Sequence, residues 1–400
     1  YMNYGDRALL RENYPMMRDY AEYLIAADEQ AGGTHLVFHS FTFGDWLAQD
    51  GMGPQSLKGG TDDAFIQGVY YLNSIELTAK AAKALDEKAD AEKYRALAES
   101  IRAALLDEYV SPNGNLTIDT QTGYVLALYY GIHRNKEKLL RGFRRRIERD
   151  FFRITCGFTG APLMLPVLLD NDMTDIAYRM LLTEEFPGWL YAVNLGATTI
   201  WERWNSLEAD GAISGTGMNS LNHYAYGSVC EAVYSRIMGL QNAAPGWKKA
   251  LIAPRIDGRI KYAAIAYDSP AGKWEAQWRI ADNGEATLEI AVPEGAEAHV
   301  ALPDHPDRLE ENVTGGAYCW SWRPTKDYLH PFSVDSRMMD LLDNADAARI
   351  VREQVPALYY ACQGKDNELR VMPPMQVANV MPLDRNAIQG MGSLLRKVKI

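Results

Sequence analysis

The sequence predicts a helical α/α toroid, followed by a small β-sandwich and a short helical extension. Three observations support this order. Segments that are apolar on most sides alternate with amphipathic segments up to about residue 245. Short alternating strands follow to about residue 330, and helical patterns return after it. Since domains average roughly 150 residues, a chain of 400 residues holds two or three. We predict domains at 1–245, 246–330 and 331–400.

The helix that begins at Asp62 is the clearest inner helix of the predicted toroid. Asp62 is placed to cap its start, and apolar residues including Ile66, Val69 and Tyr70 cover most of its surface. A helix of this kind is buried. Residues 90–109 carry a single apolar stripe among charged residues, which is typical of an outer helix. Paired inner and outer helices favour a toroid, and a plain helical array is the alternative because no tight repeat is visible.

The pattern changes near Ala244-Pro-Gly246. Before this point, residues 218–240 carry a long helical stripe. After it, four short segments alternate or run apolar between Gly, Pro, Asp and Asn residues, which predicts a β-sandwich. They are preceded by the short apolar stretch 249–254, and they span 262–267, 273–280, 285–292 and 298–302.

Composition excludes several classes of protein. A net charge of -11 argues against a nucleic-acid partner, which requires a basic face. No apolar run is long enough to span a membrane, and no signal peptide is visible, so a cytoplasmic location is expected. The four cysteines lie far apart and show no metal-ligand spacing. We therefore expect neither a metal nor a cofactor.

The most informative stretch is Trp201-Glu202-Arg203-Trp204, just before the glycine-rich run 211–217. Indole rings offer flat apolar faces on which a sugar can lie, and a carboxylate among them can move a proton. The nine Trp and 23 Tyr of the chain also favour a sugar-handling protein, although a large aromatic core is the alternative. The alternative for the stretch itself is a structural loop in which Glu202 pairs with Arg203.

Several motifs together resemble the α-L-rhamnosidases of glycoside hydrolase family 78. They cover most of residues 1–330 in the family's order. These motifs are YGDRALLRENYPMM (4–17), FGDWL (43–47), the segment 173–181, GATTIWERWNS (196–206), GMNSLNHYAYGSVCEAVY (217–234) and APGWKKALIAPR (244–255). The resemblance implies an (α/α)6 six-hairpin catalytic barrel with a C-terminal β-sandwich.

The resemblance also implies a function. Members of the family remove terminal α-L-rhamnose with inversion, which uses one carboxylic acid on the leaving oxygen and one carboxylate on water. Glu202 stands at the family's general base, and His223 matches a histidine that contacts the sugar. Trp46 matches an aromatic wall of the pocket, with Asp45 as its neighbour. Trp201 and Trp204 are further stacking candidates, and Trp204 is the stronger candidate for a purely structural role.

One departure from the family pattern matters. The Arg-Asp-Glu-Arg motif that carries the family's general acid, followed by Gly-Trp-Thr-Gly-Asp, does not occur in the sequence. The acid is therefore expected upstream of this chain, and the barrel is expected to be incomplete at its N-terminus. We then expect little or no activity on natural rhamnosides. We also expect apolar surface at Ile66, Val69 and Tyr70, or at their neighbours, to lack its full cover, which favours a homo-oligomer.

Two alternatives to a rhamnosidase remain open at this point. One is a non-catalytic carbohydrate-binding protein that retains part of the pocket. The other is a different (α/α)6 hydrolase or a phosphorylase. A phosphorylase requires a basic phosphate pocket, and the obvious basic cluster at 141–149 has the pattern of a solvated outer helix.

Overall fold

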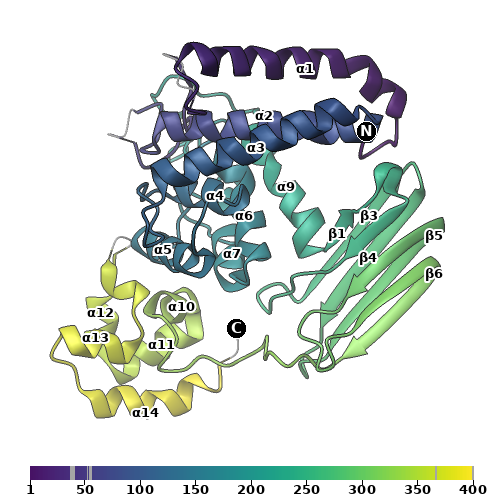
Figure 1. Cartoon of the computed structure of the whole chain (residues 1–400). Helices are drawn as coiled ribbons and strands as arrows, with labels where there is room; N and C mark the ends of the chain where they lie inside the picture. Colours follow the sequence, from purple (N-terminus) through teal and green to yellow (C-terminus); the bar gives the residue numbers. More distant parts are fainter. Residues whose placement is uncertain (37–40, 52, 54–55, 365–366, 399–400) are drawn as a thin grey trace.

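The computed structural model describes residues 1–36, 41–51, 53, 56–364 and 367–398. Figure 1 shows three parts: the helices α1–α9, the β-sheet beside them, and a separate group of short helices at the C-terminal end of the chain. No helix in the described residues is both long and apolar enough to cross a membrane.

The first part consists of paired helices. They are α1 (Arg7–Gln30), α2 (Asp63–Leu85), α3 (Lys88–Tyr109), α4 (Gln121–Tyr129), α5 (Lys136–Arg149), α6 (Ala161–Asp170), α7 (Thr174–Leu181), α8 (Trp189–Asn194) and α9 (Val229–Ala232). Every residue of α4 except the last is buried, whereas α5 buries only a stripe of Leu139, Gly142, Phe143 and Ile147. Because α4 and α6 are the buried helices and α5 and α7 carry charged outer faces, the predicted inner–outer alternation is confirmed.

Some helix starts follow local capping rules. Asp62 accepts a hydrogen bond from the backbone N–H of Phe65, as the sequence predicts, and Asp6 caps α1 through the N–H of Leu9. The expected exposure of Ile66 and Val69 is wrong, because both side chains are buried in the main core. Tyr70 points outward and is 42% exposed.

The long helix predicted over 218–240 is also wrong. Residues 218–224 are irregular, and the helical run begins only with the short 3-10 helix η1 (Ala225–Ser228). It continues through α9 into one π-helical turn, η2 (Val233–Ile237). The backbone of Ser220 and His223 pairs with Glu202 and Ile200, so these groups are not free to form helical hydrogen bonds.

The second part is a six-stranded sheet. Its strands are β1 (Leu240–Asn242), β2 (Lys249–Ile252), β3 (Tyr262–Ser269), β4 (Gly272–Ile280), β5 (Ala286–Ala301) and β6 (Glu310–Trp322). The order is β1-β2-β5-β4-β3, with β6 also paired to β5. A register shift between Val292 and Glu297 divides β5, so its first half pairs with β4 and its second half with β2. The resulting domain is sandwich-like, as predicted.

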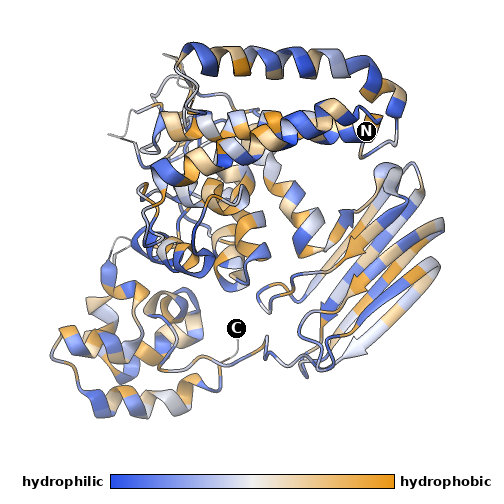
Figure 2. Ribbon diagram, in the orientation of Figure 1, coloured by the Kyte–Doolittle hydropathy of each residue, from blue (hydrophilic) through white to orange (hydrophobic). Residues whose placement is uncertain are grey.

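The sequence misses two features of this sheet. The strand β6 was not predicted, because Gly315 and Gly316 interrupt its alternation. The strand β1 begins at Leu240, inside the range 1–245 predicted as helical. Gly239 explains the early change, since its φ is +75° and a Cβ atom there would lie 2.2 Å from the backbone nitrogen of Pro254. Figure 2 shows hydrophilic and hydrophobic residues alternating along the strands.

The third part is a group of short helices with an apolar core of its own, which begins at Phe332 and includes Met338, Leu358 and Leu395. The helices are α10 (Met338–Asp343), α11 (Ala345–Gln354), α12 (Pro356–Ala361), α13 (Pro374–Val380) and α14 (Arg385–Leu395). Figure 1 places them beside the helical domain, near α5 and α7.

Candidate active site

Glu202 lies in a tight turn that is held by a returning segment of the chain. The N–H of Glu202 donates to the carbonyl oxygen of Ser220 at 2.9 Å, and the N–H of His223 donates to that of Ile200 at 2.8 Å. The Glu202 carboxylate accepts a hydrogen bond from the N–H of Ser220 at 2.8 Å. This pairing places the half-buried side chains of Glu202 and His223 on adjacent segments.

Arg203 binds the backbone of the loop that follows Glu202. Its guanidinium donates to the carbonyl oxygens of Gly217 and Met218 at 2.8–3.0 Å. Among the described residues, Glu202 and Arg203 form no ion pair with each other, so the structural-loop alternative in that form is wrong. Burial lowers the pKa of Arg203 below its usual range, and the nearby Glu202 opposes that effect.

Trp46 and His223 are linked through Phe158. The carbonyl oxygen of Trp46 accepts the N–H of Phe158 at 2.9 Å. The Phe158 ring stacks on His223 with centroids 4.9 Å apart and meets Tyr226 edge-on at 5.3 Å. Sequence reasoning missed Phe158. An aromatic residue between glycines just before a buried helix was the available signal.

Asp45, predicted to lie beside the sugar, is in fact an interior residue with 1% of its surface exposed. Its carboxylate accepts hydrogen bonds from the Thr122 hydroxyl and from the backbone N–H groups of Gly157, Thr159 and Gly160. Burial raises the pKa of Asp45 to about 6, against the opposing effect of these hydrogen bonds. Its contacts are thus with the protein.

The side chain of Trp204 is buried in the core. Its ring stacks on Tyr226 with centroids 3.9 Å apart, meets Trp189 edge-on at 5.1 Å, and donates its indole N–H to the carbonyl oxygen of Cys156. Trp201 is 5% exposed. Both indoles have the burial expected of core residues, and both also border a cavity.

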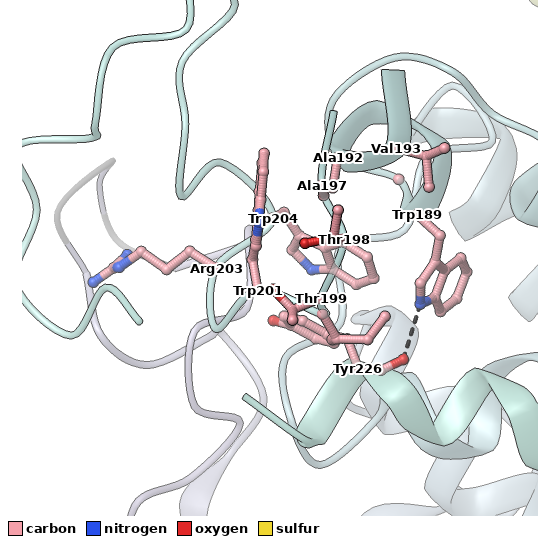
Figure 3. Close-up of a pocket in the computed structure, with 12 residues that line it drawn as sticks. Trp189, Ala192, Val193, Ala197, Thr198, Thr199, Trp201, Arg203, Trp204 and Tyr226 are labelled. Carbon is pink, nitrogen blue, oxygen red and sulfur yellow. Dashed lines mark hydrogen bonds between the residues drawn. The ribbon is translucent and has the colours of Figure 1, made fainter. Parts of the chain in front are cut away.

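That cavity has a volume of about 300 Å³ and lies against α8 (Figure 3). It is lined by Gly188, Trp189, Ala192, Val193, Ala197, Thr198, Thr199, Ile200, Trp201, Arg203, Trp204 and Tyr226. Figure 3 shows the Arg203 side chain extending away from the aromatic rings. Glu202, His223 and Trp46 are not among the lining residues. The cavity is therefore not a sugar pocket formed by those three side chains.

Within the part of the chain that the structure describes, no group of three or more His, Cys, Asp or Glu side chains is arranged to hold a metal ion. What the site offers is one half-buried carboxylate on a fixed turn, a histidine stacked on an aromatic ring, and a tryptophan on a neighbouring loop. A carboxylate and imidazole of this kind can accept protons and bind hydroxyl groups.

Paired helices around a buried centre, followed by a sandwich-like sheet, are the architecture of the six-hairpin glycosidase domain class. Residues 1–237 match the family model described as the bacterial alpha-L-rhamnosidase 6 hairpin glycosidase domain. Residues 239–317 match the bacterial alpha-L-rhamnosidase C-terminal domain. The chain belongs to the bacterial alpha-L-rhamnosidase family.

Individual relatives agree with this assignment. An alpha-L-rhamnosidase of Formosa agariphila is 35% identical over 324 residues, which cover 79% of this chain and 34% of the relative. One from Alteromonas sp. is 33% identical over 313 residues, covering 76% and 33% respectively. This chain therefore spans about a third of the length of the curated relatives that it matches.

Solved structures show the same fold. The alpha-L-rhamnosidase of Streptomyces avermitilis, in complex with L-rhamnose, is 32% identical with a TM-score of 0.72, covering 80% of this chain and 31% of that one. The native enzyme of Aspergillus terreus is 27% identical with a TM-score of 0.76, covering 82% and 38%.

Proposed function

We propose that this chain acts in the hydrolysis of terminal non-reducing α-L-rhamnose from rhamnosides by an inverting mechanism, with Glu202 as the general base. The main support is the position of Glu202: a half-buried carboxylate anchored to the Ser220 N–H in a chain of the alpha-L-rhamnosidase family. A relative of known structure is in complex with L-rhamnose, which supports the same sugar here.

The role of Glu202 follows from its chemistry. In an inverting reaction the base removes a proton from water as the water attacks the anomeric carbon, and an acid protonates the leaving oxygen. Ser220 holds one carboxylate oxygen of Glu202, which fixes the orientation of the other. His223 can bind a hydroxyl group of the sugar, and Trp46 can cover its apolar face.

A substrate with an activated leaving group isolates the base, because a nitrophenolate departs without a proton. We expect the protein to bind L-rhamnose and to release 4-nitrophenol from 4-nitrophenyl α-L-rhamnoside. Glu202→Gln should lower that release by at least about 10²-fold while L-rhamnose binding is retained. Proton NMR of the first product formed should show the β-anomer, as inversion requires.

The matched control is Glu208→Gln, a change to an exposed carboxylate a few residues along the same loop. It should leave release at the wild-type rate. A Glu202→Gln protein with near-normal release would remove Glu202 as the base. Binding of L-rhamnose by a wild-type protein that releases no nitrophenol would favour the non-catalytic carbohydrate-binding alternative.

A further inference from the structure

The Asp45 carboxylate lies where three separate segments of the helical domain meet. It belongs to the loop that carries Trp46, and it accepts the hydroxyl of Thr122 from the start of α4 at 2.6 Å. From the segment just before α6 it accepts the N–H groups of Gly157, Thr159 and Gly160 at 2.9, 3.0 and 3.3 Å. Four donors thus converge on one buried side chain.

These hydrogen bonds enclose Phe158. One Asp45 oxygen binds the N–H before Phe158 and the other binds the N–H after it. The N–H of Phe158 itself binds the carbonyl oxygen of Trp46. The backbone around Phe158 is therefore fixed on three successive residues, and this fixes the direction in which its ring projects.

The close approach requires glycine on both sides of Phe158. A Cβ atom on Gly157 would lie 2.1 Å from the carbonyl oxygen of Trp46, and one on Gly160 would lie 2.2 Å from the Thr122 hydroxyl. Neither separation is physically possible without moving the segments apart. The sequence Gly157-Phe158-Thr159-Gly160 is thus fitted to the Asp45 carboxylate.

Only a carboxylate satisfies this arrangement. Its two oxygens accept all four donors, whereas the amide of asparagine has one oxygen and would aim an N–H₂ group at backbone N–H groups. Thr159 and Gly160 directly precede the first residue of α6, Ala161, so the positive end of that helix favours an anion here.

We propose that Asp45 is a positioning residue that fixes the position of His223 relative to Trp46. It holds Phe158, and Phe158 supports the imidazole of His223 by stacking and contacts Tyr226 edge-on. The hydroxyl of Tyr226 in turn donates to the carbonyl oxygen of Leu47, beside Trp46. That these side chains hold the sugar rests on the proposed function, whereas the contacts from Asp45 through Phe158 to His223 do not depend on it.

The link can be measured by NMR without any substrate. The chain has seven histidines, so the ring protons of His223 can be assigned by labelling and mutation. Phe158 shifts them through its ring current, and Phe158→Leu removes that shift. We expect Asp45→Asn to displace Phe158 and to move the His223 resonances toward their positions in Phe158→Leu. Asp257→Asn, which changes a buried carboxylate in the β domain, should leave them unmoved.

Binding gives the second measurement. Asp45→Asn should weaken L-rhamnose binding about tenfold, the equivalent of one lost charge-assisted hydrogen bond. If Asp45→Asn does not fold, Thr122→Val decides, because it removes one of the four donors and keeps the shape of the side chain. Thr122→Val should shift the His223 resonances in the same direction. In Thr122→Ser, which retains the hydroxyl, these resonances should stay at their wild-type positions.

Folded Asp45→Asn or Thr122→Val proteins with wild-type His223 resonances would overturn the positioning role. A wild-type protein that does not bind L-rhamnose would overturn the proposed function instead. The ring-current shift would then still decide whether Asp45 positions His223, so the two failures are distinguishable.

Discussion

Trp204 stacks on Tyr226 with ring centroids 3.9 Å apart and an angle of 26° between the ring planes. Trp204 comes from the turn that carries Glu202, and Tyr226 comes from the first residues of the helical run that follows His223. Their contact joins the turn that carries Glu202 to the helical run that follows His223. This geometry makes Trp204 a structural residue, and its removal should affect folding before it affects chemistry.

We predict that Trp204→Ala lowers the free energy of unfolding by about 3–5 kcal/mol, since it opens a cavity beneath the turn. Trp204→Phe keeps an aromatic ring for the stacking but loses the hydrogen bond to Cys156 and part of the packing, which costs less, about 1–3 kcal/mol. Urea unfolding followed by circular dichroism measures both values. If Trp204→Ala kept wild-type stability and lost only L-rhamnose binding, Trp204 would be a pocket wall instead.

The pH dependence of stability should reveal Asp45. Its pKa in the folded protein is raised to about 6 from an ordinary value of 3.8, because burial disfavours the charged form. Between about pH 4 and pH 6 the unfolded chain loses this proton while the folded chain keeps it. The contribution of Asp45 is therefore fully present below pH 4 and is lost as the pH rises through 6, by about 3 kcal/mol in total.

The measurement is the difference in free energy of unfolding between wild type and Asp45→Asn across this range. As the pH rises, the wild type should lose stability relative to Asp45→Asn. A difference that grows in favour of the wild type would mean that the four donors outweigh burial and hold the pKa down. Above pH 6 the carboxylate is ionised, which is the form that accepts all four hydrogen bonds.

The C-terminal helical group should separate from the helical domain when charge pairing is weakened. Arg179, which is 11% exposed, pairs with Asp340 and Asp343 of α10, and burial lowers its pKa to about 10. Arg179 and Arg337 both lie over the ring of Phe152, at 5.5 and 4.5 Å. A cleft of about 1140 Å³, lined by charged side chains from both parts, lies around these contacts.

We therefore expect Arg179→Gln to destabilise this contact by about 3–5 kcal/mol, as loss of a buried ion partner does. Limited proteolysis between residues 330 and 336 should be faster in Arg179→Gln than in the wild type. In the wild type, added salt should also increase the rate of cleavage, because it screens the ion pairs. Arg349→Gln is the control, because its ion pairs are half exposed and contribute little. Equal cleavage of wild type and Arg179→Gln would show that charge pairing does not hold the contact.

Exposed apolar residues on α1 predict self-association. Leu9, Met16, Tyr20 and Tyr23 are each at least 50% exposed and repeat along one face of the helix. We predict that the chain forms oligomers whose population falls in Met16→Glu and Tyr20→Glu. Sedimentation velocity measures the effect, with Gln30→Glu as a control for added charge. A wild-type protein that stays monomeric at high concentration would contradict the prediction.

The sequence alone determined what depends on short-range interactions. The capping carboxylates Asp6 and Asp62, the buried and amphipathic helices, and most strands follow from residues within a few positions of one another. The resemblance around Glu202 is likewise local, because it rests on consecutive residues of one turn. These features are predictable since backbone geometry and side-chain spacing decide them before the chain folds.

Only the tertiary structure decided the contacts of Asp45, Phe158 and Arg203. The donors to Asp45 lie more than seventy positions away in sequence, and no local pattern shows that four of them will converge on one carboxylate. The irregular segment 218–224 has a helical pattern, yet pairing with the Glu202 turn takes its backbone hydrogen bonds. In each case a partner distant in sequence satisfied a polar group that would otherwise be buried alone, and that choice exists only in the folded protein.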